Sequence, residues 1–218
     1  MPCPDFGGVA QTPTVLTAWT AGVSGQQLSE TSAWTLDASW TTGSRDLGSA
    51  RGYEVLRANA GWRGRLSSRS QVVVRGGLQH SSTDLLPSAE EFQLGGSASV
   101  RGYPEGLLSG RQGFLASMEW HYALQAPQDT SDASAAPNAS QWTGILFLDH
   151  GAAFPYRPAP LSGHTHDDYL TGAGLGVIAQ WGRHVTGRLT VAWPLQDNPA
   201  LSTQKQARWM ASLTYTWP

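Results

Sequence analysis

The placement of charges within short alternating segments constrains the fold of this chain more than any other sequence feature. Between residues 54 and 66, Leu56 and Trp62 have one parity, while Arg57 and Arg63 have the other. Successive side chains of a strand point to opposite faces of the sheet. One face of such a strand is therefore apolar, and the opposite face holds its charges. The same sorting recurs in the segments 32–41, 71–79, 113–123, 142–151, 185–193 and 207–217.

This sorting is what a lipid bilayer would enforce on membrane-spanning strands. An Arg or Lys on the lipid face near the midplane costs about 2–4 kcal/mol. Only 14% of the residues are charged, and no apolar run reaches the ~18 residues that a spanning helix needs. We therefore predict an all-β fold, a transmembrane antiparallel β-barrel of about nine strands covering residues 1–218. A soluble antiparallel sandwich also alternates and remains the alternative.

The lengths of the connections favour the barrel. Outer-membrane barrels have short periplasmic turns and longer outer loops. If the C-terminus is periplasmic, the tight turns at Ser67-Ser68 and Gly182-Arg183 fall on the periplasmic side. The segment 126–140, rich in Asp, Ser, Ala and Pro, is the exception, because it would be a long periplasmic connection. The long outer connections are 42–52, 80–112, 154–168 and 194–206.

Several other functional classes are not expected. The net charge of −2 and the lack of a basic stripe give no signal for nucleic-acid binding. Cys3 is the only cysteine, so no Cys-based metal site is expected. The run His164-Thr165-His166-Asp167-Asp168 has metal-ligand chemistry, but it lies in a long loop without a second anchored set. No Gly-x-Ser-x-Gly elbow occurs, so a hydrolase in the lumen is not supported. Taken together, these features lead us to expect no enzyme, metal or cofactor.

The connection 80–112 contains the most specific candidate site. Gly95-Gly96 precedes the run Val100, Arg101, Gly102 and Tyr103. Strand parity turns Glu119, Phe147, Asp149 and Gly151 toward the inner face, together with the glycines at 172, 174 and 176. We hypothesise that Arg101 pairs with Asp149. The alternative is that Asp149 and Glu119 pair with wall arginines such as Arg75 or Arg188.

These residues resemble a known family. The pair Gly95-Gly96 with Val100-Arg101-Gly102-Tyr103, followed by Phe147-x-Asp149-x-Gly151 on the second of the next five strands, resembles the outer-membrane assembly and transport superfamily. Within it, LGGSASVRGYPEGLLSGRQG followed by Glu119 looks most like the haemolysin secretion/activation transporters of two-partner secretion. The resemblance runs from about residue 12 to the end of the chain.

The resemblance implies a fold and a site. The chain would form the last nine strands of a sixteen-stranded barrel in the bacterial outer membrane. The loop 80–112 would fold back into the lumen, where Arg101 would contact Asp149. Leu213, Tyr215 and Trp217 would form the C-terminal signal for membrane insertion. The family's periplasmic transport-associated domains and earlier strands are not in this sequence, so we expect a fragment, a truncated gene product or one part of a split protein.

The resemblance also implies a function and partners. The protein would be part of a pore that exports a large secreted polypeptide without catalysis. Its partners would be the secreted exoprotein, outer-membrane lipid and the barrel-assembly machinery. Two alternatives stay open: an insertase of outer-membrane proteins from the same superfamily, and the barrel of a fusion with a patatin-like phospholipase.

Overall fold

The computed structural model describes residues 16–45, 52–84, 86–125, 140–155, 169–196 and 206–217. Nine long strands form one antiparallel sheet in the order β1-β2-β3-β4-β7-β8-β9-β10-β11. Each long strand lies beside the long strands that precede and follow it in the chain, and the short strands β5 and β6 form a separate sheet. The strands are β1 (Leu16–Leu28), β2 (Ser32–Arg45), β3 (Tyr53–Arg65), β4 (Ser70–His80), β7 (Gln112–Ala123), β8 (Ser140–Phe154), β9 (Tyr169–Trp181), β10 (Val185–Pro194) and β11 (Arg208–Tyr215).

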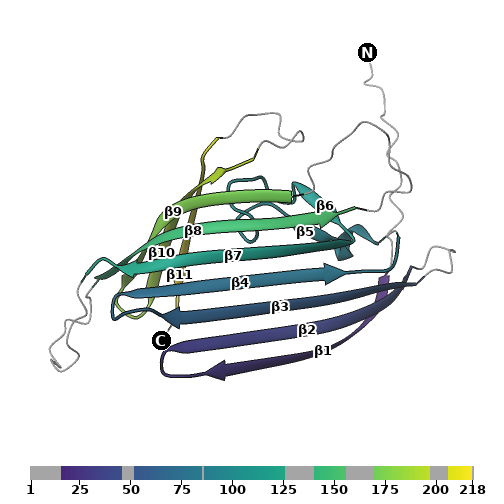
Figure 1. Cartoon of the computed structure of the whole chain (residues 1–218), viewed down its shortest axis with the longest axis horizontal. Coiled ribbons are helices and arrows are strands. Elements are labelled where there is room, and N and C mark those ends of the chain that lie inside the picture. The colour runs from purple at the N-terminus through teal and green to yellow at the C-terminus, as the bar shows by residue number, and fades with distance from the viewer. Residues whose placement is uncertain are drawn as a thin grey trace, which may run out of the picture.

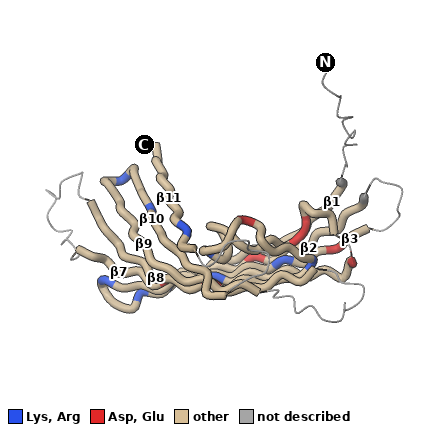
Figure 2. The backbone as a smooth tube through the Cα atoms, turned by 90° about the horizontal axis from the view of Figure 1, so that it is seen from above, with Lys and Arg blue, Asp and Glu red and all other residues tan. Residues whose placement is uncertain are grey.

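The sheet is strongly curved, and β1 and β11 form its two edges (Figure 1). Seen along the sheet, the strands make an open trough with a concave and a convex side (Figure 2). The prediction of an all-β fold with about nine antiparallel strands is confirmed. Among the described residues, no helix has the length and hydropathy needed to cross a membrane.

The convex face of the sheet is apolar and exposed, as the alternating pattern predicted. Its large side chains come from all nine strands and include several tryptophans near strand ends. Exposed apolar patches on soluble monomers rarely exceed a few hundred Å², whereas a lipid-facing surface is apolar throughout. The exposed members include Trp19, Val23, Trp34, Leu36, Leu56, Leu78, Met118, Leu146, Leu175, Leu189, Trp209 and Leu213.

The connection between β4 and β7 lies on the concave side of the sheet (Figure 2). It contains a 3-10 turn, η1 (Ser88–Glu90), and a two-stranded hairpin of β5 (Phe92–Leu94) and β6 (Leu108–Gly110). No sequence pattern predicted this hairpin. Both of its strands pack against β8.

The main hydrophobic core lies between this connection and the sheet. Leu94, Val100 and Tyr103 of the connection pack against Ala153 of β8 and Leu170 of β9. All five side chains are almost fully buried. The inner wall is therefore covered locally by a packed segment of the same chain, and this core positions the polar site described next.

Candidate functional site

Strand register places the polar residues of the wall in two adjacent rows. Ser117 of β7 lies opposite Asp149 of β8, which lies opposite Gly172 of β9. In the next row, Glu119 lies opposite Phe147, which lies opposite Gly174. Residues opposite each other in neighbouring strands and residues two apart in one strand point to the same side of a sheet, so all six positions share the concave face. Two carboxylates, an aromatic ring and two positions without side chains thus surround one small area of wall.

The loop between β5 and β6 delivers Arg101 to this area. Gly95 and Gly96 have φ values of +106° and +100°, and Gly102 has +98°. Only glycine adopts such angles without strain. The Gly95 N–H donates to Ser99 Oγ at 2.8 Å, which closes the loop tip. Val100 and Tyr103, on either side of Arg101 and Gly102, lie in the hydrophobic core.

Arg101 binds Asp149 through three hydrogen bonds. Its Nε and Nη2 donate to Asp149 Oδ2 and Oδ1, each at 2.7 Å, and its backbone N–H donates to Oδ2 at 3.1 Å. This bidentate arrangement matches the planar guanidinium to the carboxylate. The exposed fractions of the two side chains are 4% and 0%. The structure therefore brings together the pair that parity and the resemblance pointed to.

Glu119 completes the coordination of Arg101. Arg101 Nη1 donates to Glu119 Oε1 at 2.5 Å, and His121 Nε2 lies 2.7 Å from Glu119 Oε2. Arg188 Nη2 also donates to Oε1, at 2.8 Å, and Arg75 Nη2 lies 3.8 Å from the same oxygen. The wall-arginine alternative thus holds in part: Glu119 pairs with Arg101 and with wall arginines, whereas Asp149 pairs with Arg101.

The remaining wall positions create space and a stacking surface for the loop. The Arg101 guanidinium carbon lies 3.5 Å from the centroid of the Phe147 ring, a cation–π arrangement. A Cβ at residue 172 would collide with the Arg101 carbonyl oxygen, and one at 174 would collide with the Phe147 ring. At residue 151, a Cβ would lie 2.8 Å from Leu94 Cδ1. These glycines allow the loop and the ring to approach the wall closely.

The charges at this site are buried, so each depends on its partners. Burying an ion costs several kcal/mol, and geometry with complete hydrogen bonding must offset that cost. Here, every buried side-chain nitrogen and oxygen of the described residues has a hydrogen-bond partner. The cluster is therefore a rigid attachment of the loop tip to the wall, and removal of one member leaves buried charges with fewer compensating contacts.

Comparison with known proteins identifies the family of the chain. A family model described as haemolysin secretion/activation protein ShlB/FhaC/HecB matches residues 9–179. The chain belongs to this family. Members of the ShlB/FhaC/HecB family are outer-membrane β-barrel transporters of two-partner secretion in Gram-negative bacteria. The match favours the transporter interpretation over the insertase and phospholipase-fusion alternatives.

A solved structure supports the same fold. CdiB from Escherichia coli is similar over 91% of this chain, with a TM-score of 0.70 and 21% sequence identity. The present chain covers 36% of the CdiB chain. No curated protein matches the sequence. The barrel architecture is therefore shared, while this member of the ShlB/FhaC/HecB family spans about a third of the length of that relative.

Two site residues were not singled out from the sequence. Ser117 Oγ donates to Asp149 Oδ1 at 2.7 Å, and His121 contacts the second oxygen of Glu119. Both share the inward parity of Glu119 in the alternating segment of β7. That parity was a usable signal, but it could not indicate which neighbouring carboxylate each side chain would reach.

A second attachment of the loop was also missed. Arg57 Nη2 donates to Glu90 Oε2 at 2.6 Å, and the Tyr53 hydroxyl donates to Glu90 Oε1 at 3.1 Å. Gln79 Nε2 donates to the Glu90 carbonyl oxygen at 2.8 Å. Leu86 packs against Tyr53 and Val55 in a small hydrophobic cluster beside these contacts. The base of the loop is therefore fixed to β3 and β4, while its tip is fixed to β7 and β8.

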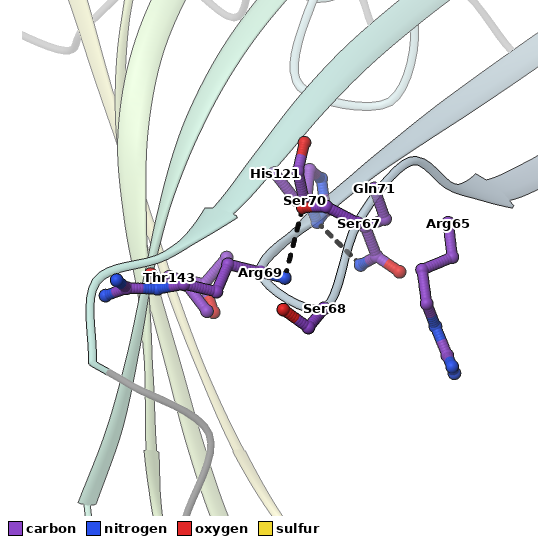
Figure 3. Close-up of a pocket in the computed structure, with 9 residues that line it drawn as sticks. Arg65, Ser67, Ser68, Arg69, Ser70, Gln71, His121 and Thr143 are labelled. Atoms are coloured by element: carbon purple, nitrogen blue, oxygen red, sulfur yellow. Dashed lines mark hydrogen bonds between the residues drawn. The ribbon is translucent and has the colours of Figure 1, made fainter.

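A pocket at the β3–β4 turn does not form a comparable site. It is lined by Arg65, Arg69, His121 and several serines. Figure 3 shows Arg65 and Arg69 pointing to opposite sides of the turn, with Ser68 between them. Arg69 donates to the carbonyl oxygens of Ala123 and Leu124. The two guanidinium groups do not converge on one point, so the pocket has no common anion-binding centre.

The other predicted residues lie apart from this cluster. Leu213, Tyr215 and Trp217 are exposed at the β11 edge, and the Tyr215 and Trp217 rings make an edge-to-face contact. The run His164–Asp168 lies outside the described residues. Within the described ranges, no three His, Cys, Asp or Glu side chains come together as a metal site.

Proposed function

We propose that this chain forms the C-terminal part of an outer-membrane pore that exports a large secreted polypeptide. The single observation that supports this most is the buried attachment of Arg101 to Asp149 and Glu119 on the concave wall. A loop held this firmly inside the curve of a barrel-forming sheet occupies space through which a polypeptide would pass. The chain's membership in a transporter family agrees with this role.

The connection 80–112 is the structural and gating element of this proposal. In the barrel, it would be inserted into the lumen, with Val100, Gly102 and Tyr103 packing the tip around Arg101. Phe147, Asp149, Gly151 and Glu119 would form the receiving wall. Export requires no bond to be made or broken by the protein, so these residues hold and release the loop rather than catalyse a reaction.

The surface of the sheet supports the assignment of the other partners. The exposed apolar convex face would contact the hydrocarbon of the outer membrane. Leu213, Tyr215 and Trp217 would serve as the C-terminal signal recognised by the barrel-assembly machinery. The exported partner would be an exoprotein that crosses the barrel in an extended conformation.

Gene deletion in the bacterium that carries this sequence tests the function. The gene would be complemented with wild type, Arg101→Ala or Arg65→Ala, and proteins in the medium and the periplasm would be quantified by mass spectrometry. We expect deletion to remove a large polypeptide from the medium, and wild type and Arg65→Ala to restore it. Arg65 is a suitable control because it is exposed and makes no side-chain hydrogen bond or ion pair with any described residue.

The same experiment separates the alternatives. An unchanged medium together with depletion of several outer-membrane barrels would contradict export and favour an insertase. Full export by a stably inserted Arg101→Ala protein would show that the Arg101 attachment is dispensable for transport. Outer-membrane levels of each variant, measured in the same cells, distinguish a transport defect from failed insertion.

A further inference from the structure

Three guanidinium groups converge beside a pocket on the concave face. Arg101, Arg188 and Arg75 all reach Glu119 Oε1, at 2.5, 2.8 and 3.8 Å. Asp149 is engaged by Arg101 and Ser117, and the second oxygen of Glu119 is engaged by His121. Three permanent positive charges therefore face two carboxylates, which leaves an excess of one positive charge in this cluster.

The excess charge is concentrated on the two outer arginines. Arg101 is buried, but the Arg75 and Arg188 side chains are 51% and 33% exposed. In contacts with described residues, each uses only Nη2 of its guanidinium. Because a guanidinium has five N–H donors on three nitrogens, most donors of both groups remain free to bind a further acceptor.

These free donors border a cavity. A pocket of about 290 Å³ is lined by the polar residues Arg75, Ser97, Arg101, Arg188, Thr190 and Ser212, and by Met210 and Ala211 of β11. Ser97 belongs to the loop tip, Arg75 to β4, and Arg188 and Thr190 to β10. The pocket therefore lies between the loop tip, β4 and the β10–β11 part of the wall. Guanidinium and hydroxyl groups line it.

We infer that this pocket binds a carboxylate side chain of an acidic segment in the polypeptide that passes through the pore. A carboxylate accepts hydrogen bonds from two guanidinium groups and balances the excess charge, whereas a Lys or Arg side chain would be repelled. An extended segment on the concave face would place an Asp or Glu between Arg75 and Arg188, beside Ser97 of the loop tip. This inference rests on the proposed export function for the origin of the ligand.

Peptide binding to the full chain in detergent micelles tests the site. The probes are a hexapeptide with one Glu among Ser and Asn residues, the same peptide with Gln, and free acetate, each titrated calorimetrically in 20 mM and 300 mM NaCl. Two partly exposed ion pairs predict about tenfold tighter binding of the Glu peptide than of the Gln peptide at low salt. High salt should reduce this preference, because it screens exposed charges.

Matched variants locate the binding. Arg75→Gln/Arg188→Gln should abolish the preference for Glu, whereas Arg63→Gln/Arg65→Gln removes the same charge from an exposed part of β3 and should leave it intact. Arg75→Lys/Arg188→Lys retains the charge and should keep part of the preference. If the lysine variant keeps part of the preference for Glu, misfolding is excluded as the cause of the loss in the glutamine variant. Circular dichroism confirms that each variant is folded.

The outcomes separate this site from the proposed function. Equal binding of the Glu and Gln peptides, or a preference unaffected in Arg75→Gln/Arg188→Gln, overturns the site. Acetate binding as tight as that of the Glu peptide overturns the polypeptide ligand and leaves a small-anion site. Loss of a polypeptide from the medium on gene deletion, without any peptide preference, would keep export and reject the site, and the reverse result would keep the site and reject export.

Discussion

The tip and the base of the β4–β7 connection are both held by an arginine and a carboxylate, but in different surroundings. At the tip, Arg101, Asp149 and Glu119 have exposed side-chain fractions of 4%, 0% and 5%. At the base, Arg57 and Glu90 are 31% and 19% exposed, although their closest N–O distance is 2.6 Å. Similar distances therefore occur with very different access to water.

Burial decides what each attachment contributes. A partly exposed ion pair such as Arg57–Glu90 approaches the contribution of about 0–1 kcal/mol of exposed pairs, because water and salt screen part of its attraction. Breaking a buried pair costs about 3–5 kcal/mol, since the remaining partner is left as an uncompensated charge. The tip attachment therefore depends strongly on correct geometry, while the base attachment depends on it less. A loop that opens in two stages would release its tip as one step and keep its base in place.

Replacing Arg101 with Met should have the largest effect on this comparison. Asp149 would lose its charge partner and keep only the Ser117 hydroxyl and the backbone N–H of residue 101. Glu119 would keep Arg188 and His121. Loss of one partner of a buried ion pair costs about 3–5 kcal/mol. That energy corresponds to exchange of the backbone amides at 95–106 becoming roughly a hundredfold faster or more. Hydrogen-exchange mass spectrometry of the chain in detergent micelles measures this change segment by segment.

The control for this experiment is Arg101→Lys. Lysine keeps the charge but lacks the planar fork that binds a carboxylate at two points, so intermediate exchange is expected. Unchanged exchange at 95–106 in Arg101→Met would show that hydrophobic packing alone holds the tip, and the distinction between tip and base would fail.

Replacing Gly172 with Ala disturbs the contact of the loop tip with the barrel wall by a change in the wall. Its Cβ would collide with the Arg101 carbonyl oxygen, so the loop must shift or detach, at a cost of about 1–3 kcal/mol typical of overpacking. Gly25→Ala in β1 is the matched control, because a Cβ there meets no atom within 4 Å. The free energy of unfolding, measured by chemical denaturation with tryptophan fluorescence, should fall for Gly172→Ala only. The amide exchange rate at 95–106 should likewise rise for Gly172→Ala only. A shift of equal size at residue 25 would indicate a general effect of alanine in the strands.

The sequence predicted the sheet and the tip attachment, but not the base attachment. Alternation is a local property, so parity alone placed Leu56 and Arg57 on opposite faces and turned Asp149 inward. The spacing of Val100–Tyr103 and Phe147–Gly151 then identified Arg101 and Asp149 as partners through the family resemblance. Glu90 gave no such signal, because it lies in the short 3-10 turn of a loop, where no strand alternation relates it to Arg57.

Replacing Ser117 with Ala tests how much a single hydrogen bond from a neutral donor contributes to the attachment of the tip. Its hydroxyl donates to Asp149 Oδ1 at 2.7 Å, and it is buried. Loss of this bond should cost about 0.5–1.5 kcal/mol, because Asp149 keeps its bonds to Arg101. Exchange at 95–106 should accelerate severalfold, far less than in Arg101→Met. Combining the two variants should give less than the sum of their effects, since both act on one carboxylate; strict additivity would argue against a shared network.

Replacing Glu90 with Gln should have the smallest effect and is the most direct test of the base. The glutamine oxygen still accepts from Arg57 or Tyr53, and the Glu90 carbonyl bond to Gln79 remains. Only the partly exposed charge attraction is lost, so we expect a change of at most about 1 kcal/mol. Exchange should accelerate about fivefold or less at 86–91 and remain unchanged at 95–106. Because salt screens exposed pairs, 0.5 M NaCl should narrow the difference between Glu90→Gln and wild type but leave the Arg101→Met difference intact. If salt narrowed both differences equally, the two attachments would have the same access to water, and burial could not be the reason that they differ.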